Sequence, residues 1–250
     1  MMAERITSLD VARRAGVSQS AVSRVFTPGA SVSKEMSAKV RAAAEALGYR
    51  PNVLARSLIT GRSRIVGLVL AYLENQFYPV ALEKLSAALQ AEGYHILIFL
   101  APNDRAAMDQ VMEELLAYQV DGIIAASVAM TGDLASRCAD AGIPVVLFNR
   151  DQDEADLPAV TSDNRAGGRE VARFLLAGGH RRIAHIAGWR GASTGRDREA
   201  GFREGLAEGG AAPVAVIDGL YRREVAAEAA RTLFAPGGPR PDALFVGNDH

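Results

Sequence analysis

From residue 65 onward, short β-rich runs alternate with stretches in which apolar residues recur at helical spacing, and this alternation restricts the fold more than any other feature. Strand and helix in turn form parallel βαβ units with helices on both faces of the sheet. We therefore predict an α/β body of two doubly wound lobes, residues 65–155 and 156–250, with a crossover near residues 150–163. The predicted strands are Ile65–Ala71, His95–Leu100, Asp121–Ala126, Val145–Asn149, Arg182–Ala187, Val214–Ile217 and Ala243–Val246. The helical repeats include Leu82, Leu85 and Leu89, then Met108, Val111, Met112 and Leu115, and then Val171, Phe174 and Leu175.

The net charge of −1 conceals a strong segregation of charge along the chain. Residues 1–64 hold 11 basic and 4 acidic residues, a net charge of +7, whereas the rest holds 17 basic and 25 acidic residues, a net charge of −8. A basic segment attached to an acidic body is typical of a nucleic-acid-binding module joined to a domain that does not bind DNA. The alternative explanation of this segregation is an uneven distribution of surface charge without a role in binding.

Composition excludes several classes of protein. A chain of 250 residues with 49% hydrophobic content can bury a substantial core, so a disordered or fibrous protein is not expected. Its apolar runs are far shorter than the roughly 18 residues of a membrane span, and no secretory signal is seen, so a cytoplasmic protein without a membrane partner is predicted. The single cysteine, Cys138, lies in a helical pattern and is expected to pack as a small apolar residue.

Residues 5–48 read as three short helices. Thr7 and Asp10 can cap the first helix, in which Leu9, Val11, Ala12 and Ala15 occupy helical spacing up to Gly16. Ser18 can cap a second helix over residues 19–26, and a third helix begins at Ser33 and stops at Gly48. The second helix has a buried stripe of Ala21, Val22 and Val25 and turns outward Gln19, Ser20, Ser23 and Arg24. Residues 1–48 are thus predicted to form an all-α helix-turn-helix headpiece.

Three segments, Asp10-Val11-Ala12, Ala15-Gly16-Val17-Ser18 and Val22-Ser23-Arg24-Val25, resemble the headpiece signature of the LacI (lactose repressor) family. The resemblance continues through Tyr49-Arg50-Pro51-Asn52 and Ala55-Arg56-Ser57-Leu58 and along the rest of the chain. It implies a dimeric transcriptional regulator that binds a palindromic operator in double-stranded DNA. It also implies a body like that of periplasmic binding proteins, with a sugar or related metabolite as the effector. The operator, the identity of the effector, and the choice between repressor and activator remain open.

The resemblance implies that Gln19 and Ser20 approach base edges and that Arg24 contacts a guanine or a phosphate. The chemistry of these side chains agrees, because glutamine pairs bidentately with adenine and arginine with guanine. Ala21 stands where the family commonly has threonine, so one phosphate contact is expected to be lost. The full set of expected DNA contacts is Thr7, Ser18, Gln19, Ser20, Ser23, Arg24, Asn52, Ala55 and Leu58.

Residues 49–64 are predicted to form a hinge with a short helix capped by Asn52. A helix of this length is marginal in water, so we expect it to order only on DNA. By resemblance, Leu58 wedges into the minor groove at the operator centre, where apolar wedges unstack a base step. The alternative is that Leu58 packs against its own body.

Ligands of doubly wound sheets bind beyond the carboxyl ends of the strands, and polar and aromatic residues gather at those ends here. Aromatic rings pack on the apolar faces of sugars, while amide, carboxylate and guanidinium groups pair with hydroxyls. By resemblance, Asp163, Arg198 and Asn248 match effector contacts of the family. The candidate effector residues are Asn75, Phe77, Tyr78, Ser127, Asn149, Asp163, Trp189, Arg198, Asn248 and Asp249, with Arg150 beside Asn149.

Two other functions use the same scaffold, namely enzymes and secreted solute-binding proteins. No dinucleotide fingerprint, phosphate-binding loop or nucleophile elbow is present, so no catalytic residue, cofactor or enzyme activity is predicted. The histidines His95, His180, His185 and His250 lack metal-ligand spacing, and no metal site is predicted. The basic headpiece and the missing signal argue against a secreted protein.

The sequence ends at His250, directly after the last predicted strand, whereas bodies of the family continue for several βα units. We therefore expect the second lobe to be incomplete and the chain to be a fragment or a truncated product, with weak dimerisation and DNA binding.

Overall fold

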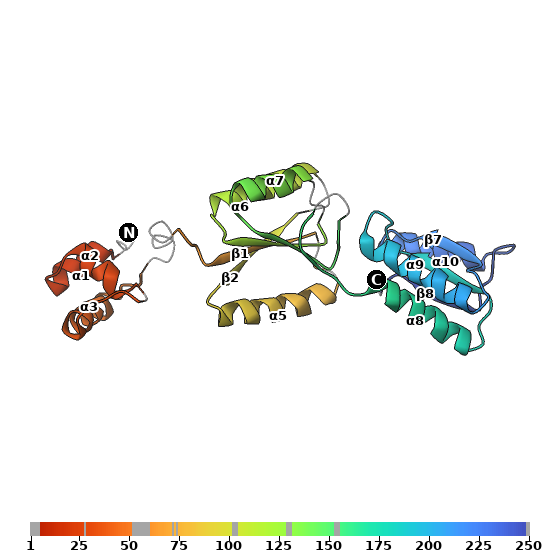
Figure 1. The fold of residues 1–250 in the computed structure, drawn as a ribbon, viewed down its shortest axis with the longest axis horizontal. Coiled ribbons are helices and arrows are strands. Elements are labelled where there is room, and N and C mark those ends of the chain that lie inside the picture. The colour runs from red at the N-terminus through yellow and green to blue at the C-terminus, as the bar shows by residue number, and fades with distance from the viewer. Residues whose placement is uncertain are drawn as a thin grey trace. The chain divides into compact units, whose positions relative to one another are not determined.

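The structure, a computed structural model, describes residues 6–27, 29–51, 61–71, 73, 75–101, 105–128, 132–152 and 156–248 (Figure 1). The chain divides into two compact units, residues 1–63 and residues 64–250. We refer to them as the headpiece unit and the body.

The headpiece unit contains the helices α1 (Ser8–Ala15), α2 (Gln19–Val25) and α3 (Lys34–Leu47), so the three predicted helices are confirmed. Each begins at a side-chain cap. The Thr7 hydroxyl accepts the Asp10 amide, and the Asp10 carboxylate accepts the Thr7 amide at 2.9 Å, which forms a capping box. Ser18 and Ser33 cap α2 and α3, and Gly16 ends α1 with a φ of 65°, a left-handed conformation that glycine adopts without strain.

Small side chains let the three headpiece helices approach closely. Val11, Val22 and Val40, one from each helix, are fully buried together. Leu9, which shares the helical spacing of Val11, Ala12 and Ala15, is 43% exposed. It lies at the edge of the apolar face of α1, because the neighbouring helices close over the Val11, Ala12 and Ala15 side.

The first sheet of the body is five-stranded and parallel, in the order β2-β1-β3-β4-β5. Its strands are β1 (Ile65–Leu70), β2 (His95–Leu100), β3 (Gly122–Ala126), β4 (Val145–Phe148) and β5 (Ala159–Val160). The predicted doubly wound architecture is confirmed, and the four predicted strands agree with the structure to within one residue. The sequence does not predict β5, because its two residues are exposed and form no apolar run. Since β5 pairs with β4, the first sheet extends beyond residue 155.

Both faces of this sheet are covered by helices. α5 (Phe77–Ala91) lies on one face, and α6 (Arg105–Ala117) and α7 (Gly132–Asp140) lie on the other (Figure 1). Successive residues of β1 therefore enter different cores, because side chains of a strand alternate between the faces of the sheet. Leu68 and Leu70 pack with Tyr78 on the α5 side, and Val69 packs in the core on the α6 and α7 side.

Cys138 of α7 is fully buried in that second core, as expected for a cysteine that packs as a small apolar residue. Burial raises the pKa of its thiol.

The second sheet is three-stranded and parallel, in the order β7-β6-β8. It comprises β6 (Ile183–Ala187), β7 (Ala215–Asp218) and β8 (Ala243–Val246), and its helices are α8 (Asn164–Ala177), α9 (Ser193–Glu208) and α10 (Arg223–Phe234). Ile183 packs with Phe202 and Leu206 of α9, and Ile186 packs with Leu233 of α10, so both faces of β6 are covered.

His185 on β6 is fully buried, with its ring stacked on Phe245 at a centroid distance of 4.5 Å. Its Nδ1–H donates to the Phe245 carbonyl at 2.9 Å. Burial lowers the pKa of His185, so the imidazole is neutral near pH 7 and serves packing.

Glycines bring α8 and α9 into backbone contact. A Cβ at Gly201 would lie 1.8 Å from the Arg165 carbonyl oxygen, and one at Gly168 would lie 2.3 Å from that of Arg198. This contact sets the rotation of α8 about its axis. Phe174, expected in the apolar repeat of this segment, is 76% exposed because Gly168 and Ala172 face inward in its place.

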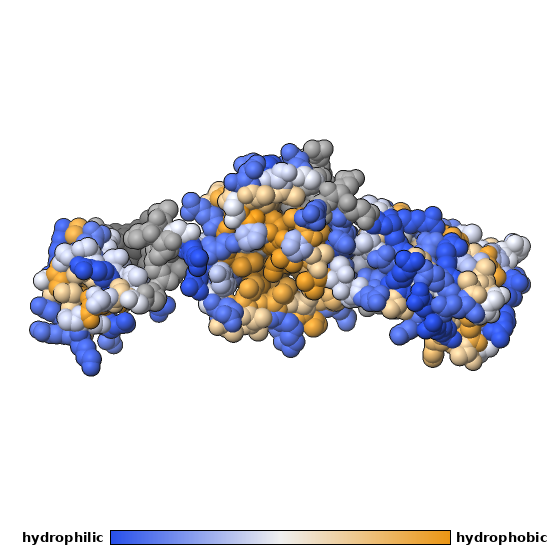
Figure 2. Space-filling view, in the orientation of Figure 1, coloured by the Kyte–Doolittle hydropathy of each residue, from blue (hydrophilic) through white to orange (hydrophobic). Residues whose placement is uncertain are grey.

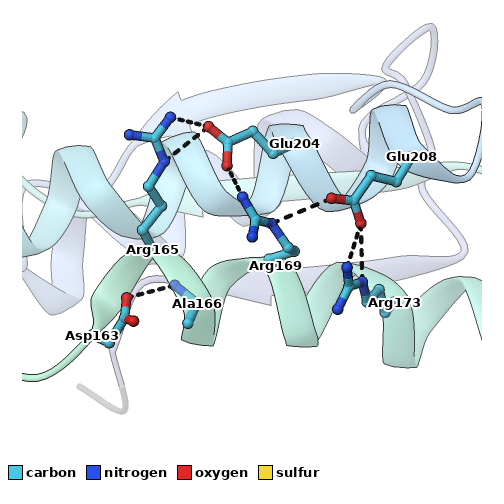
Figure 3. A network of polar contacts seen from close by, with 7 residues as sticks. All are labelled: Asp163, Arg165, Ala166, Arg169, Arg173, Glu204 and Glu208. Carbon is cyan, nitrogen blue, oxygen red and sulfur yellow. Dashed lines mark hydrogen bonds and ion pairs between the residues drawn. The ribbon is translucent and has the colours of Figure 1, made fainter.

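A ladder of ion pairs, which we call the Arg–Glu ladder, runs along the outer side of α8 and α9 (Figure 3). Arg165, Arg169 and Arg173 of α8 alternate with Glu204 and Glu208 of α9. Arg165 donates to Glu204 through Nε at 2.9 Å, and Arg173 donates to Glu208 through Nη2 at 2.8 Å. Hydrogen bonds from Arg165 and then Arg169 lower the pKa of Glu204 from 4.5 to about 2.

Apolar side chains also gather on the outer surface of the first lobe, over the region of β1, β2 and α5 (Figure 2). The exposed apolar residues of these elements include Ile98 and Leu100 of the edge strand β2 and Val80 of α5. None of the helices in the described part of the chain has the length and apolar character needed to span a membrane.

Two adjacent glycines of α8 test the helix contact. Gly168→Ala should lower the free energy of unfolding by about 1–3 kcal/mol, because its Cβ meets the α9 backbone. Gly167→Ala, where a Cβ meets nothing within 4 Å, should raise it by about 0.5–1 kcal/mol through helix propensity. Urea unfolding followed by circular dichroism measures both variants. Equal effects of the two substitutions would show that the α8–α9 contact does not limit side-chain size.

The Arg–Glu ladder should make stability depend on pH in acid. The folded-state pKa of Glu204 is depressed, so its contribution is present above its ordinary pKa of 4.5 and is lost as pH falls towards about 2. Glu204→Gln should therefore lower the urea midpoint at about pH 6 and change it much less at about pH 2. Glu228→Gln, which breaks an exposed pair with Arg231 on α10, is the control and should have little effect. If Glu204→Gln lowers the urea midpoint equally at both pH values, the ion pairs of Glu204 are not the source of the pH dependence.

Candidate nucleic-acid interface and effector pocket

The outward face of α2 carries the side chains that the sequence predicted for it. Gln19, Ser20, Ser23 and Arg24 are exposed, and Ala21, Val22 and Val25 are buried beneath them. Arg24 makes no ion pair with any described residue, so its guanidinium is available to a partner. Together these four residues form a polar surface with one positive charge on a short helix, which we call the α2 face.

The amino-terminal ends of α1 and α2 lie together at this surface. Gln19, the first residue of α2, donates from Nε2 to the hydroxyl of Ser8, the first residue of α1, at 2.9 Å. The Ser18 hydroxyl accepts the Ala21 amide and lies 2.9 Å from the Ser20 hydroxyl. Ser8 was not predicted as a site residue, because a contact between residues 11 apart leaves no local signal in the sequence.

Of the other predicted DNA contacts, the Thr7 hydroxyl is engaged with Asp10 in the capping box. The hinge residues Asn52, Ala55 and Leu58 lie outside the described residues, and their roles stay predictions.

The body contains a pocket of about 380 Å³, which we call the body pocket. Several of its residues follow strands of the two sheets, as the rule for doubly wound folds predicts. Asn149 and Arg150 follow β4, and Tyr221 and Asn248 come after β7 and β8. The residues that line it are Asn75, Phe77, Tyr78, Asn149, Arg150, Ser162, Thr194, Arg198, Tyr221 and Asn248.

A buried hydroxyl organises the first-lobe wall of the body pocket. Ser127, which does not line the pocket, accepts a hydrogen bond from the Tyr78 hydroxyl. Asn149 donates from Nδ2 to Ser127 at 3.0 Å and to Tyr78 at 3.1 Å. Phe77 stacks on Phe148 with ring centroids 5.8 Å apart. The amide and the two rings are therefore held in place before a ligand binds.

Two arginines bring positive charge to the lining. Arg198 donates from Nε to the Asn164 amide oxygen at 2.8 Å and from Nη1 to the Gly247 carbonyl at 2.5 Å. Both acceptors are neutral, so the charge of Arg198 is not cancelled by these bonds. Arg150 is only 8% exposed, and its guanidinium lies 5.8 Å from the centroid of the Tyr221 ring.

Strained backbone is concentrated around the body pocket. Four of the seven non-glycine residues with positive φ in the described chain are Ser127, Asn149, Leu220 and Tyr221, with φ between 55° and 71°. Such conformations persist only where the surrounding structure enforces them, and they cluster at ligand sites.

The structure gathers six of the ten candidate effector residues at the pocket: Asn75, Phe77, Tyr78, Asn149, Arg198 and Asn248. Asp163 is not among the lining residues, and its carboxylate accepts the Ala166 amide at 2.9 Å to cap α8 (Figure 3). Trp189 is 40% exposed beside Arg150, and Asp249 lies outside the described residues. Ser162, Thr194 and Tyr221 also line the pocket and were not predicted from the sequence.

Tyr221 could have been found, because it follows a predicted strand in the same way as the other candidates. Its ring packs on Gly188, where a Cβ would lie 2.1 Å from a ring carbon. Thr194 lies in the first turn of α9, 3.2 Å from the Tyr221 hydroxyl, and it gives no signal before that helix is placed. Among the described residues, no three His, Cys, Asp or Glu side chains gather as a metal site requires.

Both units of the chain match families of known proteins. Residues 7–52 match the family model of bacterial regulatory proteins of the lacI family, and residues 66–250 match that of the periplasmic binding protein domain. The sucrose operon repressor of Klebsiella pneumoniae is 32% identical over 98% of this chain and 75% of its own length. The repressor PurR of Pectobacterium carotovorum is 31% identical over 97% of this chain and 72% of its own length.

Solved structures agree with these matches. The lac repressor dimer bound to operator and the anti-inducer ONPF is 25% identical, with a TM-score of 0.86 over 98% of this chain and 74% of that one. The complex of the transcriptional regulator CelR with cellobiose is 29% identical, with a TM-score of 0.67 over 97% of this chain and 74% of that one.

The capped helix-turn-helix, the two doubly wound sheets and the pocket beyond their strands thus occur together with family matches over nearly the whole chain. The chain belongs to the LacI family of DNA-binding transcriptional regulators.

Proposed function

We propose that this chain represses transcription by reading an operator with the α2 face, and that a small polar ligand in the body pocket controls its affinity for that operator. The observation that carries the proposal is the exposure of Gln19, Ser20, Ser23 and Arg24 over a fully packed helix-turn-helix. A rigid helix with amide, hydroxyl and guanidinium groups on one side suits direct readout in the major groove. The hinge assignment, with Leu58 as the minor-groove wedge, belongs to the same proposal, as does a cytoplasmic location beside the DNA.

We propose a homodimer as the binding species. A palindromic operator requires two copies of the recognition helix, related by a two-fold axis. The exposed apolar residues of β2 and α5, which include Ile98, Leu100 and Val80, provide a surface that a second copy can cover. The lac repressor structure with a similar fold is described as a dimer on operator, which supports this assembly.

We propose a sugar or a sugar phosphate as the effector. Phe77, Tyr78 and Tyr221 offer ring faces, and Asn75, Asn149 and Asn248 offer amides, a combination that suits a ring bearing hydroxyls. Arg150 and Arg198 add guanidinium groups, which bind phosphate oxygens well. CelR binds cellobiose, and the Pseudomonas putida regulator Cra binds fructose 1-phosphate, so both neutral and phosphorylated ligands occur among structural neighbours.

Enzyme activity is not part of the proposal. The named relatives are DNA-binding regulators rather than enzymes.

Two single substitutions in the headpiece test the DNA-binding proposal. Arg24→Ala should cost about 1–3 kcal/mol of discrimination between a selected palindromic duplex and random DNA. Lys39→Ala, an exposed change on α3, should weaken both duplexes by a similar factor, since a phosphate contact carries no sequence information. Fluorescence anisotropy over a salt series measures both effects, and the wild-type affinity should fall steeply as salt rises.

If Arg24→Ala lowers the affinity for selected and random DNA by the same factor, Arg24 does not take part in base readout. A single half-site duplex is the control for the dimer and should bind the wild-type chain more weakly than the palindrome. A wild-type affinity that is independent of salt would contradict the proposed function itself.

Arg198→Ala should remove the response to effector while DNA affinity without ligand stays unchanged. The substitution deletes a guanidinium that lines the pocket, whereas the α2 face belongs to the other unit. Calorimetry with sucrose, cellobiose, ribose and fructose 1-phosphate identifies a ligand for the wild-type chain, and the same titration is repeated on the variant. Arg203→Ala is the matched control, because Arg203 lies on the same helix and pairs with Glu199 instead. Unchanged ligand affinity in Arg198→Ala would show that the effector binds elsewhere.

A further inference from the structure

The hydrogen bond between Gln19 and Ser8 has a consequence for base recognition. Gln19 Nε2 lies 2.9 Å from the Ser8 hydroxyl oxygen, and this is its one polar side-chain contact with a described residue. Ser8 and Gln19 are the first residues of α1 and α2, and their neighbours Thr7 and Ser18 cap the two helices. The backbone that carries the Ser8 hydroxyl is therefore fixed by the capping box of α1. The hydroxyl lies next to Gln19, the first side chain of α2.

A glutamine amide has one oxygen and two N–H groups, and only one N–H lies on the same side as the oxygen. A bidentate contact with adenine uses that N–H and the oxygen, which pair with N7 and the N6 amino group of the base. The second N–H is not used by the base. A neighbour that accepts this second N–H can therefore fix the plane of the amide without competing with adenine.

We propose that Ser8 is a positioning residue that holds the Gln19 amide for adenine readout in the operator. The proposal rests on the proposed function, in which Gln19 faces the bases. Gln19 Nε2 donates to the Ser8 hydroxyl, and in the proposal this bond uses the N–H that lies opposite the amide oxygen, so that Oε1 and the N–H beside it stay free for the base. A glutamine side chain has several rotatable bonds, and the cost of ordering them on DNA is reduced when one end is already held.

A hydroxyl in this place also restricts the choice of base. With one N–H occupied, the amide presents a fixed donor–acceptor pair rather than a freely turning group. Adenine offers a matching acceptor and donor side by side in the major groove, whereas guanine offers two acceptors. The predicted consequence is a sharper preference for adenine, rather than tighter binding to every sequence.

The experiment uses the full chain and a palindromic duplex that the wild-type chain selects from a randomised pool. Gln19→Ala first identifies the base position that Gln19 reads, as the position whose preference it removes. At that position, anisotropy titrations with each of the four bases measure the adenine preference of wild type and variants. Ser8→Ala should lower the adenine preference about five- to tenfold, and Ser8→Thr, which keeps the hydroxyl, should restore it to within about twofold.

Two controls separate positioning from general stability. Ser86→Ala in α5 removes a like bond, from Gln90 Nε2 to a serine hydroxyl at 3.1 Å, and should leave the base preference unchanged. Ser8→Ala added to Gln19→Ala should cause no further loss of preference, because the hydroxyl acts only through the amide.

Equal weakening by Ser8→Ala on all four bases would show a structural role and overturn the proposal. An unchanged preference in Ser8→Ala, or a base other than adenine at the Gln19 position, would overturn it as well. If the wild-type chain selects no duplex, the proposed function fails together with this inference. If it selects one and Gln19→Ala alters no position, only the inference fails.

Discussion

The body depends on the requirement that parallel strands be covered on both faces. The strands β1 and β6 send successive side chains into two different cores, so each sheet needs helices above and below it. The helices return the chain to the start of each new strand, and all the carboxyl ends therefore meet at one edge. Polar residues placed after strands then lie together without any pairing signal in the sequence, and the body pocket is the result.

The side chains of the body pocket and of the α2 face are held in place by different interactions. The α2 face has to stay exposed and chemically simple, so its helix is stabilised from below by small apolar residues such as Val22 and by the Ser18 cap. The polar groups of the body pocket lie near apolar cores, and hydrogen bonds among these groups fix their positions. Ser127, Tyr78 and Asn149 form such a group, and the positive φ of Ser127 and Asn149 shows that the surrounding structure enforces it.

Close helix contact has its own consequences in the second lobe. Gly168 and Gly201 let the backbones of α8 and α9 touch, and the long side chains that flank them meet outside the contact as the Arg–Glu ladder. Arg198 of α9, whose carbonyl oxygen takes part in this contact, donates to Asn164 and Gly247 and lines the body pocket. The glycines thus set the position of a helix that contributes a lining residue to the body pocket.

Local signals in the sequence determined the elements: caps at Thr7, Ser18 and Ser33, glycine stops, and apolar runs that mark seven of the eight strands in the described part of the chain. Short-range pattern also predicts the basic headpiece, its helix-turn-helix and the exposed side of α2. The helical period of 3.6 residues fixes which residues of a helix lie on the same face. Tertiary structure alone decided the exposure of Phe174 and the contacts of Thr194 with Tyr221 and of Ser8 with Gln19. Each of these depends on how one helix is turned against its neighbour, and that rotation is set by the fit of many side chains and backbone atoms, which no local run of residues encodes.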